Sequence, residues 1–98
     1  MASRYLYITL PSGRAHTVEL DGVVVIGRDR QNDIVLDDAS ISRYHAMLLV
    51  EAHGVVLFDL ESTNGTLVNG KLVLPEAPVA LEDGTQIALG PVLARYHE

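Results

Sequence analysis

The chain has no cysteine among its 98 residues. This absence excludes disulfide bonds and thiolate metal sites, and it is compatible with a reducing compartment. Long apolar runs are also absent, since none approaches the roughly 20 residues that a helix needs to cross a bilayer. The first ten residues, MASRYLYITL, lack the basic stretch and apolar core of a secretion signal. We therefore expect a soluble, cytoplasmic protein with no membrane partner.

Lysine is almost missing, because Lys71 is the only one, and the formal net charge is −6. Such a chain is a poor general binder of nucleic acid, since a phosphate backbone requires a basic face. Three of the six arginines nonetheless fall within one short region, at positions 28, 30 and 43. The planar guanidinium group is well suited to gripping a single phosphate. The charge pattern therefore argues against nucleic acid but leaves a phosphorylated ligand open.

Apolar and polar residues alternate along much of the chain, as in residues 4–10, where Leu6, Ile8 and Leu10 share one face. This period of two predicts β-strands, and turn residues separate the runs about every eight to twelve positions. Short strands at that spacing are typical of a β-sandwich or barrel. Strands are expected at residues 4–10, 16–20, 23–27, 33–36, 45–52, 55–60, 66–69, 71–74, 85–89 and 92–97.

Glycine-containing pairs predict hairpins between several of these runs. They occur at Asp21-Gly22, His53-Gly54, Asn69-Gly70 and Gly90-Pro91. Helix is poorly supported, because its one candidate segment, PEAPVALEDG, carries two prolines and no apolar stripe. The ordered pattern runs nearly from end to end. We therefore expect a single domain over residues 1–98, of the kind that serves as a module in a longer protein.

Three polar segments lie between the expected strands: RDRQND at 28–33, DDASISRYH at 37–45 and ESTNGT at 61–66. All three are rich in Arg, Ser, Thr or Asn. Loops at one end of a sandwich cluster in space, so these segments could form one site.

In order and spacing, the stretches IGRDRQNDIVLDDASISRYHAML and FDLESTNGTLVNG resemble the forkhead-associated (FHA) domain, a phosphothreonine-binding module. The resemblance depends on the Gly-Arg pair, the SxxH motif and the NGTxVNG motif occurring together, because each alone is common. It covers essentially the full chain. It implies an all-β sandwich of about eleven short, mostly antiparallel strands with the binding loops clustered at one end.

The resemblance also implies the phosphopeptide-binding positions, which are Arg28, Ser42, Arg43, Thr63 and Asn64. A phosphothreonine carries nearly two negative charges and three strong acceptor oxygens. The two arginines would supply cationic donors, and Ser42 and Thr63 would supply hydroxyl groups. The amide of Asn64 both donates and accepts, which suits it to hold a peptide backbone.

Four further residues are implied to support the site. His45 is expected to fix the Ser42 loop through side-chain hydrogen bonds, and Asn69 to tie neighbouring loops together. Gly27 and Gly65 would allow the backbone to approach or turn where a side chain would clash. Of the two Asn-Gly pairs in this region, the second is expected to be mainly a turn, and the first both a turn and part of the site.

The same residues have plainer interpretations. Arg28 could be a surface side chain paired with Asp29 or Asp33. Ser42 could cap the turn into the following strand, and Arg43 could be a solvated charge. A scaffold or oligomerisation domain of the same fold that needs no phosphate is the alternative function.

Catalysis and metal binding find little support in the sequence. The histidines are scattered without ligand spacing, so neither a metal nor a cofactor is expected. A Ser42–His45 pair would need an orienting acid and an oxyanion hole, and Asp59 is the one candidate acid. No catalytic residue is assigned, and the chain is not expected to be an enzyme.

The resemblance further implies a partner protein bearing a phosphothreonine and a Ser/Thr kinase acting upstream. In this family the residue three positions after the phosphothreonine largely selects the partner, and the loop ahead of Ser42 commonly reads it. Ser40 and Ile41 stand in that loop, which has no basic residue. We therefore expect the domain to show little preference for an acidic residue three positions after the phosphothreonine, and an apolar residue at that peptide position is the alternative.

Overall fold

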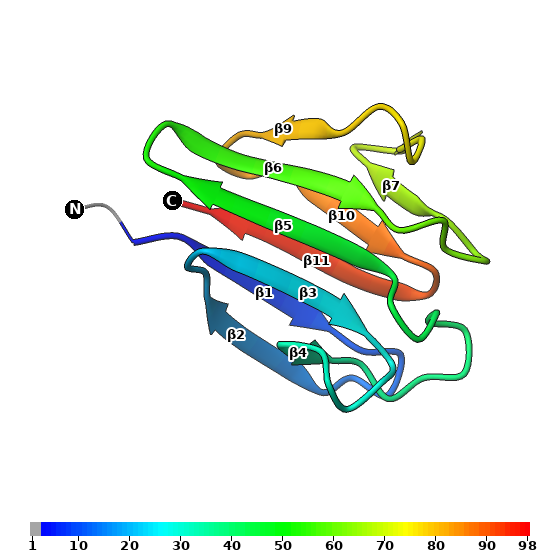
Figure 1. Cartoon of the computed structure of the whole chain (residues 1–98). Coiled ribbons are helices and arrows are strands. Elements are labelled where there is room, and N and C mark those ends of the chain that lie inside the picture. The colour runs from blue at the N-terminus through cyan, green and yellow to red at the C-terminus, as the bar shows by residue number, and fades with distance from the viewer. Residues whose placement is uncertain (1–2) are drawn as a thin grey trace.

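The computed structural model describes residues 3–98, which form two β-sheets packed face to face (Figure 1). One sheet has six strands in the order β2-β1-β11-β10-β7-β8, and the other has five in the order β4-β3-β5-β6-β9. Of the paired strands, β3 and β4 alone run parallel. The predicted all-β sandwich of eleven strands is confirmed. The strands are β1 (Tyr5–Thr9), β2 (Ala15–Glu19), β3 (Val23–Gly27), β4 (Ile34–Val35), β5 (Ala46–Glu51), β6 (Gly54–Asp59), β7 (Thr66–Val68), β8 (Lys71–Leu72), β9 (Val79–Leu81), β10 (Gln86–Leu89) and β11 (Val92–His97).

The space between the sheets is filled by the inward side chains of alternating strand positions. Leu6 and Ile8 of β1 face Leu48 of β5 and Leu57 of β6 across this core, and each is at most 1% exposed. Burying one such side chain contributes about 1.5–3 kcal/mol. No helix occurs within residues 3–98, so no helix in this range could cross a membrane.

Three of the predicted hairpins are confirmed, but the one at Asp21-Gly22 is wrong. The turns at 53–54, 69–70 and 90–91 join paired neighbours. At Asp21-Gly22, however, the chain passes from β2 in the six-stranded sheet to β3 in the five-stranded sheet. Turn chemistry specifies a local bend, whereas the partner of a strand is chosen by the apolar face that it must bury.

The segment at 75–84 contains a strand that the periodicity did not predict. β9 has three residues, Val79–Leu81, and pairs with β6 at the edge of its sheet. Three residues are too few to give a recognisable alternation. The segment contains no helix, as expected from Pro75 and Pro78, which both disfavour one.

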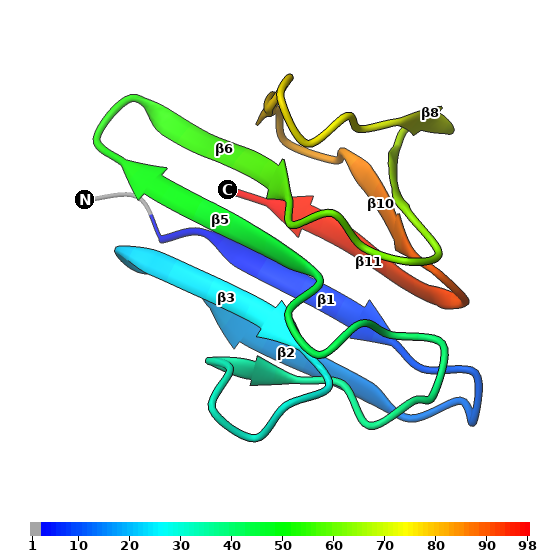
Figure 2. The same cartoon turned by 45° about the vertical axis from the view of Figure 1, so that its right-hand side comes forward.

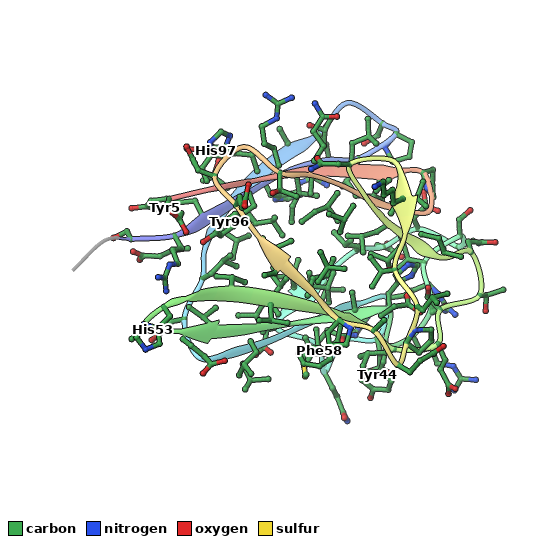
Figure 3. All side chains as sticks on the ribbon, turned by 90° about the horizontal axis from the view of Figure 1, so that it is seen from above. Tyr5, Tyr44, His53, Phe58, Tyr96 and His97 are labelled. Carbon is green, nitrogen blue, oxygen red and sulfur yellow. The ribbon has the colours of Figure 1, made fainter. Side chains whose placement is uncertain are left out.

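A pH-dependent loss of stability is expected from Tyr96, which is fully buried between the sheets (Figure 3). Burial, together with the hydrogen bond to Glu98 (2.9 Å) and the charge of that carboxylate, raises the pKa of Tyr96 to about 12. In the unfolded chain a tyrosine loses its proton near pH 10. The stabilisation is therefore complete below about pH 10 and is lost as pH rises towards about 12.

The thermal midpoint of Tyr96→Phe should accordingly fall less between about pH 9 and 11.5 than that of the unsubstituted chain. Circular dichroism melting curves would measure both, with the exposed Tyr7→Phe as a control that keeps the full fall. Equal falls in all three proteins would contradict the assignment.

Candidate functional site

Three loops meet at the end of the sandwich opposite the start of β1 and the end of β11 (Figures 1 and 2). They connect β3 to β4, β4 to β5, and β6 to β7. The backbone N–H of Arg28 donates to the carbonyl of Ser42 (3.0 Å), and that of Thr63 donates to Ser42 Oγ (2.9 Å). Asn64 Nδ2 donates to the carbonyl of Ser40 (2.8 Å). The structure thus brings Arg28, Ser42, Thr63 and Asn64 into one cluster.

Arg28 is exposed, and its guanidinium group is oriented by one hydrogen bond from Nε to the carbonyl of Ile41 (3.0 Å). Asp29 and Asp33 do not pair with it. They accept backbone N–H groups instead, at 2.9 and 2.8 Å. The ion pairs within residues 3–98 involve neither Arg28 nor Arg43. The interpretation of Arg28 as half of a surface ion pair is therefore wrong.

The remaining donors of the cluster are directed by the same network. Because Ser42 Oγ already accepts the Thr63 N–H, its own proton remains available to an incoming acceptor. Asn64 uses one amide hydrogen on Ser40, which leaves its Oδ1 and a second hydrogen. Arg43, Thr63 and Asn64 are all exposed. The surface therefore presents two guanidinium groups, two hydroxyl groups and one amide.

His45 is fully buried and joins two of the three loops. Its Nδ1 accepts the Ser42 N–H (3.1 Å), and its Nε2 donates to the carbonyl of Gly65 (2.9 Å). This pair of bonds requires the neutral ring with its proton on Nε2. Both ring nitrogens are therefore engaged with backbone groups, and neither is hydrogen-bonded to Ser42 Oγ.

Asp59, the candidate acid for a catalytic pair, holds a different part of the loop. It is buried, and its carboxylate accepts hydrogen bonds from the hydroxyl groups of Ser62 and Thr66, the latter at 2.7 Å. No hydrogen bond joins its carboxylate to the His45 ring. The geometry required for a Ser-His-Asp arrangement does not occur.

Gly27 is required by close packing. A Cβ at this position would lie 2.2 Å from the carbonyl oxygen of Arg43, a distance that real atoms do not adopt. The same carbonyl accepts the Asp29 N–H (3.1 Å) and the Nδ2 of Asn32 (2.7 Å). The backbone of Arg43 is thus fixed against β3 while its side chain faces solvent.

Sequence reasoning missed two contributors to the site. Asn32 is only 7% exposed, and its amide also donates to the carbonyl of Asp29 (2.8 Å). Gly90, in the β10–β11 turn, has a φ of +54°, and a Cβ there would lie 3.3 Å from the carbonyl of Ser40 and 3.8 Å from the Cβ of Asn64. Neither has a sequence signal of its own, since an Asn in a polar loop and a Gly in a turn are both common.

The two Asn-Gly pairs differ in conformation. Asn69 and Gly70 have φ values of +48° and +82°, as a two-residue hairpin turn requires. Asn69 Oδ1 also accepts the backbone N–H of Gln86 (2.9 Å), which ties this hairpin to β10. In the first pair only Gly65 has a positive φ (+85°), so Asn64-Gly65 forms no hairpin turn and instead leads the chain from one sheet to the other.

Ser40 and Ile41 are placed differently. Ile41 is 1% exposed and belongs to the core, and its carbonyl accepts the Arg28 bond described above. Ser40 is half-buried beside Asn64. Of these two side chains, only that of Ser40 can meet a ligand.

Comparison with known proteins agrees with this geometry. A sequence profile of the FHA domain matches residues 24–90. This chain belongs to the FHA domain family. It is 36% identical over 88 residues to the transcriptional regulatory protein EmbR of Mycobacterium tuberculosis, a match that covers 90% of this chain and 22% of EmbR. The domain thus spans less than a quarter of that curated relative.

Solved FHA domains have the same architecture. The FHA domain of CT664 from Chlamydia trachomatis superposes with a TM-score of 0.89 at 30% identity, covering 99% of this chain and 98% of that one. A domain studied for phosphothreonine-dependent FHA interactions superposes with a TM-score of 0.84 at 32% identity, covering 99% of this chain and 97% of that one. EmbR in complex with a low affinity phosphopeptide gives 0.84 at 33% identity, with 98% of this chain and 24% of EmbR covered.

Replacing His45 by Ala should destabilise the fold by about 2–4 kcal/mol, because it leaves a cavity and two polar backbone groups without partners. Urea unfolding followed by circular dichroism would measure this. His53→Ala, in the exposed β5–β6 turn, is the matched control and should change stability by less than about 0.5 kcal/mol. Equal stabilities of the two variants would show that the imidazole bridge contributes nothing to folding.

Proposed function

We propose that this FHA domain binds a phosphothreonine-containing segment of a partner protein, and so recruits proteins that a Ser/Thr kinase has phosphorylated. The observation that carries the proposal is the cluster of outward donors at one end of the sandwich, in which Arg28 and Arg43 have no acidic partner among residues 3–98. A dianionic phosphate is the ligand that such a cluster suits.

Arg28 is the central cation in this proposal. Its Nε bond to the Ile41 carbonyl holds the guanidinium plane, so that little conformational freedom is lost when the outer nitrogens bind phosphate. Hydrogen bonds between charged groups contribute about 1.5–3 kcal/mol each. Arg43 would add a second cation, and Ser42 and Thr63 would add neutral donors to the remaining phosphate oxygens.

Asn64 would hold the peptide backbone beside the phosphate. Its free Oδ1 can accept a backbone N–H, and its remaining amide hydrogen can donate to a carbonyl. Such pairing fixes the direction of an extended peptide without reading its sequence. The EmbR structure, an FHA-containing relative solved with a phosphopeptide, supports this choice of ligand class.

The overall charge of −6 opposes phosphopeptides at long range, so the arginines act locally. Charges more than about 8 Å apart are screened at physiological salt. We expect a dissociation constant in the micromolar range, or roughly −7 to −8 kcal/mol, that weakens as salt is added.

Calorimetric titration with an oriented phosphothreonine peptide library, and with the same library unphosphorylated, tests the proposal. Binding should occur only to the phosphorylated pool, and Arg28→Ala should weaken it by about a hundredfold, since about 2–3 kcal/mol of charged hydrogen bonding is removed. Arg30→Ala, an exposed arginine in the same loop, should retain affinity. Equal binding to both pools would instead identify a phosphate-independent scaffold.

Partner selection is tested on peptide arrays that vary the residue three positions after the phosphothreonine. No basic side chain lies at Ser40 or Ile41, so Asp and Glu should not be enriched there. Ser40→Lys should create an enrichment of acidic residues, because it adds a cation beside Asn64. A strong preference for Asp or Glu in the unsubstituted domain would contradict the expected role of this loop.

A further inference from the structure

The outer face of the five-stranded sheet is apolar at positions that an open antiparallel sheet usually fills with polar residues. Seven apolar side chains occupy the middle of this face. Two of them are exposed, with Val23 at 55%, and the other five are half-buried. Figure 3 shows Phe58 on the side of the sheet away from the core. The seven residues form two rows across the strands. One row is Val23, Leu49, Val56 and Ala80 on β3, β5, β6 and β9, and the other is Val25, Met47 and Phe58 on β3, β5 and β6. We refer to these seven residues as the apolar face.

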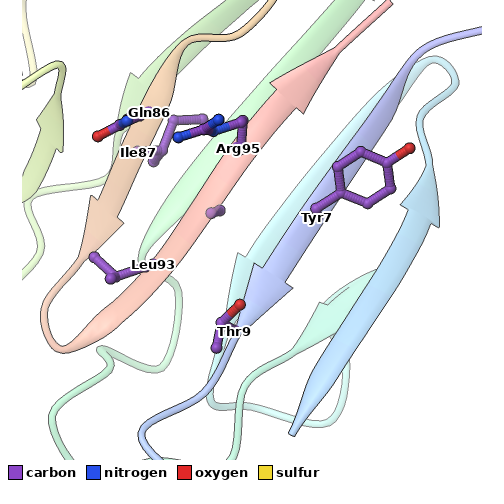
Figure 4. A pocket seen from close by; sticks show the side chains of 7 residues that line it. Tyr7, Thr9, Gln86, Ile87, Leu93 and Arg95 are labelled. Carbon is purple, nitrogen blue, oxygen red and sulfur yellow. The ribbon is translucent and has the colours of Figure 1, made fainter. Parts of the chain in front are cut away.

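The outer face of the six-stranded sheet also carries apolar side chains, but polar ones interrupt them. Its row Leu93, Ala88, Leu67 and Leu72 on β11, β10, β7 and β8 is apolar, and Leu93 and Leu72 are 60% and 59% exposed. The neighbouring row consists of Tyr7, Arg95 and Gln86 on β1, β11 and β10, and Thr9 lies opposite Leu93 (Figure 4). Apolar and polar side chains are mixed there, as expected for a solvated sheet. Contiguous exposed apolar patches on soluble proteins commonly mark sites of interaction.

The apolar face is separate from the phosphate cluster. Its rows cross the middle of the strands, whereas Arg28 follows the end of β3, three residues or about 10 Å beyond Val25. The loops that carry Ser42 and Thr63 lie beyond the same end. One ligand on the face and another on the loops could therefore be bound together.

Carboxylates border one end of the apolar face. Glu51 is two residues beyond Leu49 on β5 and so lies on the outer side of the sheet. Asp21 and Glu82 lie at the same end, in the connections that precede β3 and follow β9. The Val50 N–H donates a hydrogen bond to the Gly22 carbonyl (2.8 Å), so β5 stays paired with the residue just before β3 at this end. These three exposed carboxylates form no ion pair with any residue between 3 and 98.

The size of the apolar face fits a helix better than a second copy of the domain. The longer row spans four strands, or about 14 Å, and the two rows are about 7 Å apart. A helix about 10–12 Å in diameter covers that area in about three turns. A stable protein–protein interface generally takes about 20–30 residues a side, far more than seven, and two copies of charge −6 would repel each other.

We propose that the apolar face docks an amphipathic helix of a partner protein, with leucine-like side chains on the two rows and Lys or Arg meeting Asp21, Glu51 and Glu82. This contact does not depend on the proposed phosphothreonine site. It would give the domain a second point of attachment and raise the effective concentration of a phosphorylated partner.

A synthetic leucine–lysine peptide of about 18 residues, with its leucines at i, i+3, i+4 and i+7, is the probe. Amide chemical shifts of the 98-residue domain should change on β3, β5, β6 and β9, and the peptide should bind saturably at concentrations where it is itself monomeric. Leu49→Ser should weaken binding at least about tenfold, and the isosteric Val56→Thr should weaken it to a smaller degree. A scrambled peptide of the same composition should not bind.

Matched controls separate this contact from general attraction to an acidic protein. Leu93→Ser on the opposite sheet should leave peptide affinity unchanged, whereas Glu51→Lys should weaken it about threefold. Leu49→Ser should retain phosphopeptide affinity. The proposal is overturned if the peptide does not bind, if Leu93→Ser matches Leu49→Ser, or if sedimentation shows a dimer of the unsubstituted chain that Leu49→Ser abolishes.

Discussion

The candidate site is held by a buried imidazole that joins loops leading into different sheets. His45 accepts a hydrogen bond from the Ser42 N–H, just before β5, and donates to the Gly65 carbonyl, just before β7. β5 lies in the five-stranded sheet and β7 in the six-stranded sheet. The relative position of the Ser42 and Thr63 hydroxyls, on which any shared ligand would depend, is therefore set inside the protein.

Acidic and basic residues of the loops have different tasks, although the sequence mixes them. Asp29 and Asp38 accept backbone N–H groups within their own turns, and Asp33 accepts the N–H of Val25 in β3. Their carboxylates are thereby held away from the arginines. A chain of net charge −6 can in this way present Arg28 and Arg43 at one end with no acidic partner among residues 3–98.

The fold could be predicted from the sequence where its signals are local and repeated. Alternation and glycine turns predicted ten of the strands and three hairpins, and the resemblance to a known family predicted the sandwich. The crossing at Asp21-Gly22 could not be predicted, because it depends on which sheet buries Val24 and Ile26. Asn32 and Gly90 were missed for a related reason: each acts through a contact with a loop that is distant in sequence.

The pairing of β1 with β11 has a mechanical consequence. Tyr5, at the start of β1, lies opposite His97, at the end of β11, so the chain enters β1 and leaves β11 at neighbouring points. Tension applied through Arg4 and Glu98 would separate the two strands from that end, loading their hydrogen bonds one after another rather than all together. Strands separated in this way would resist less force than strands pulled along their length, and the separation would begin at the end of the sandwich farthest from the loops of the candidate site (Figure 1).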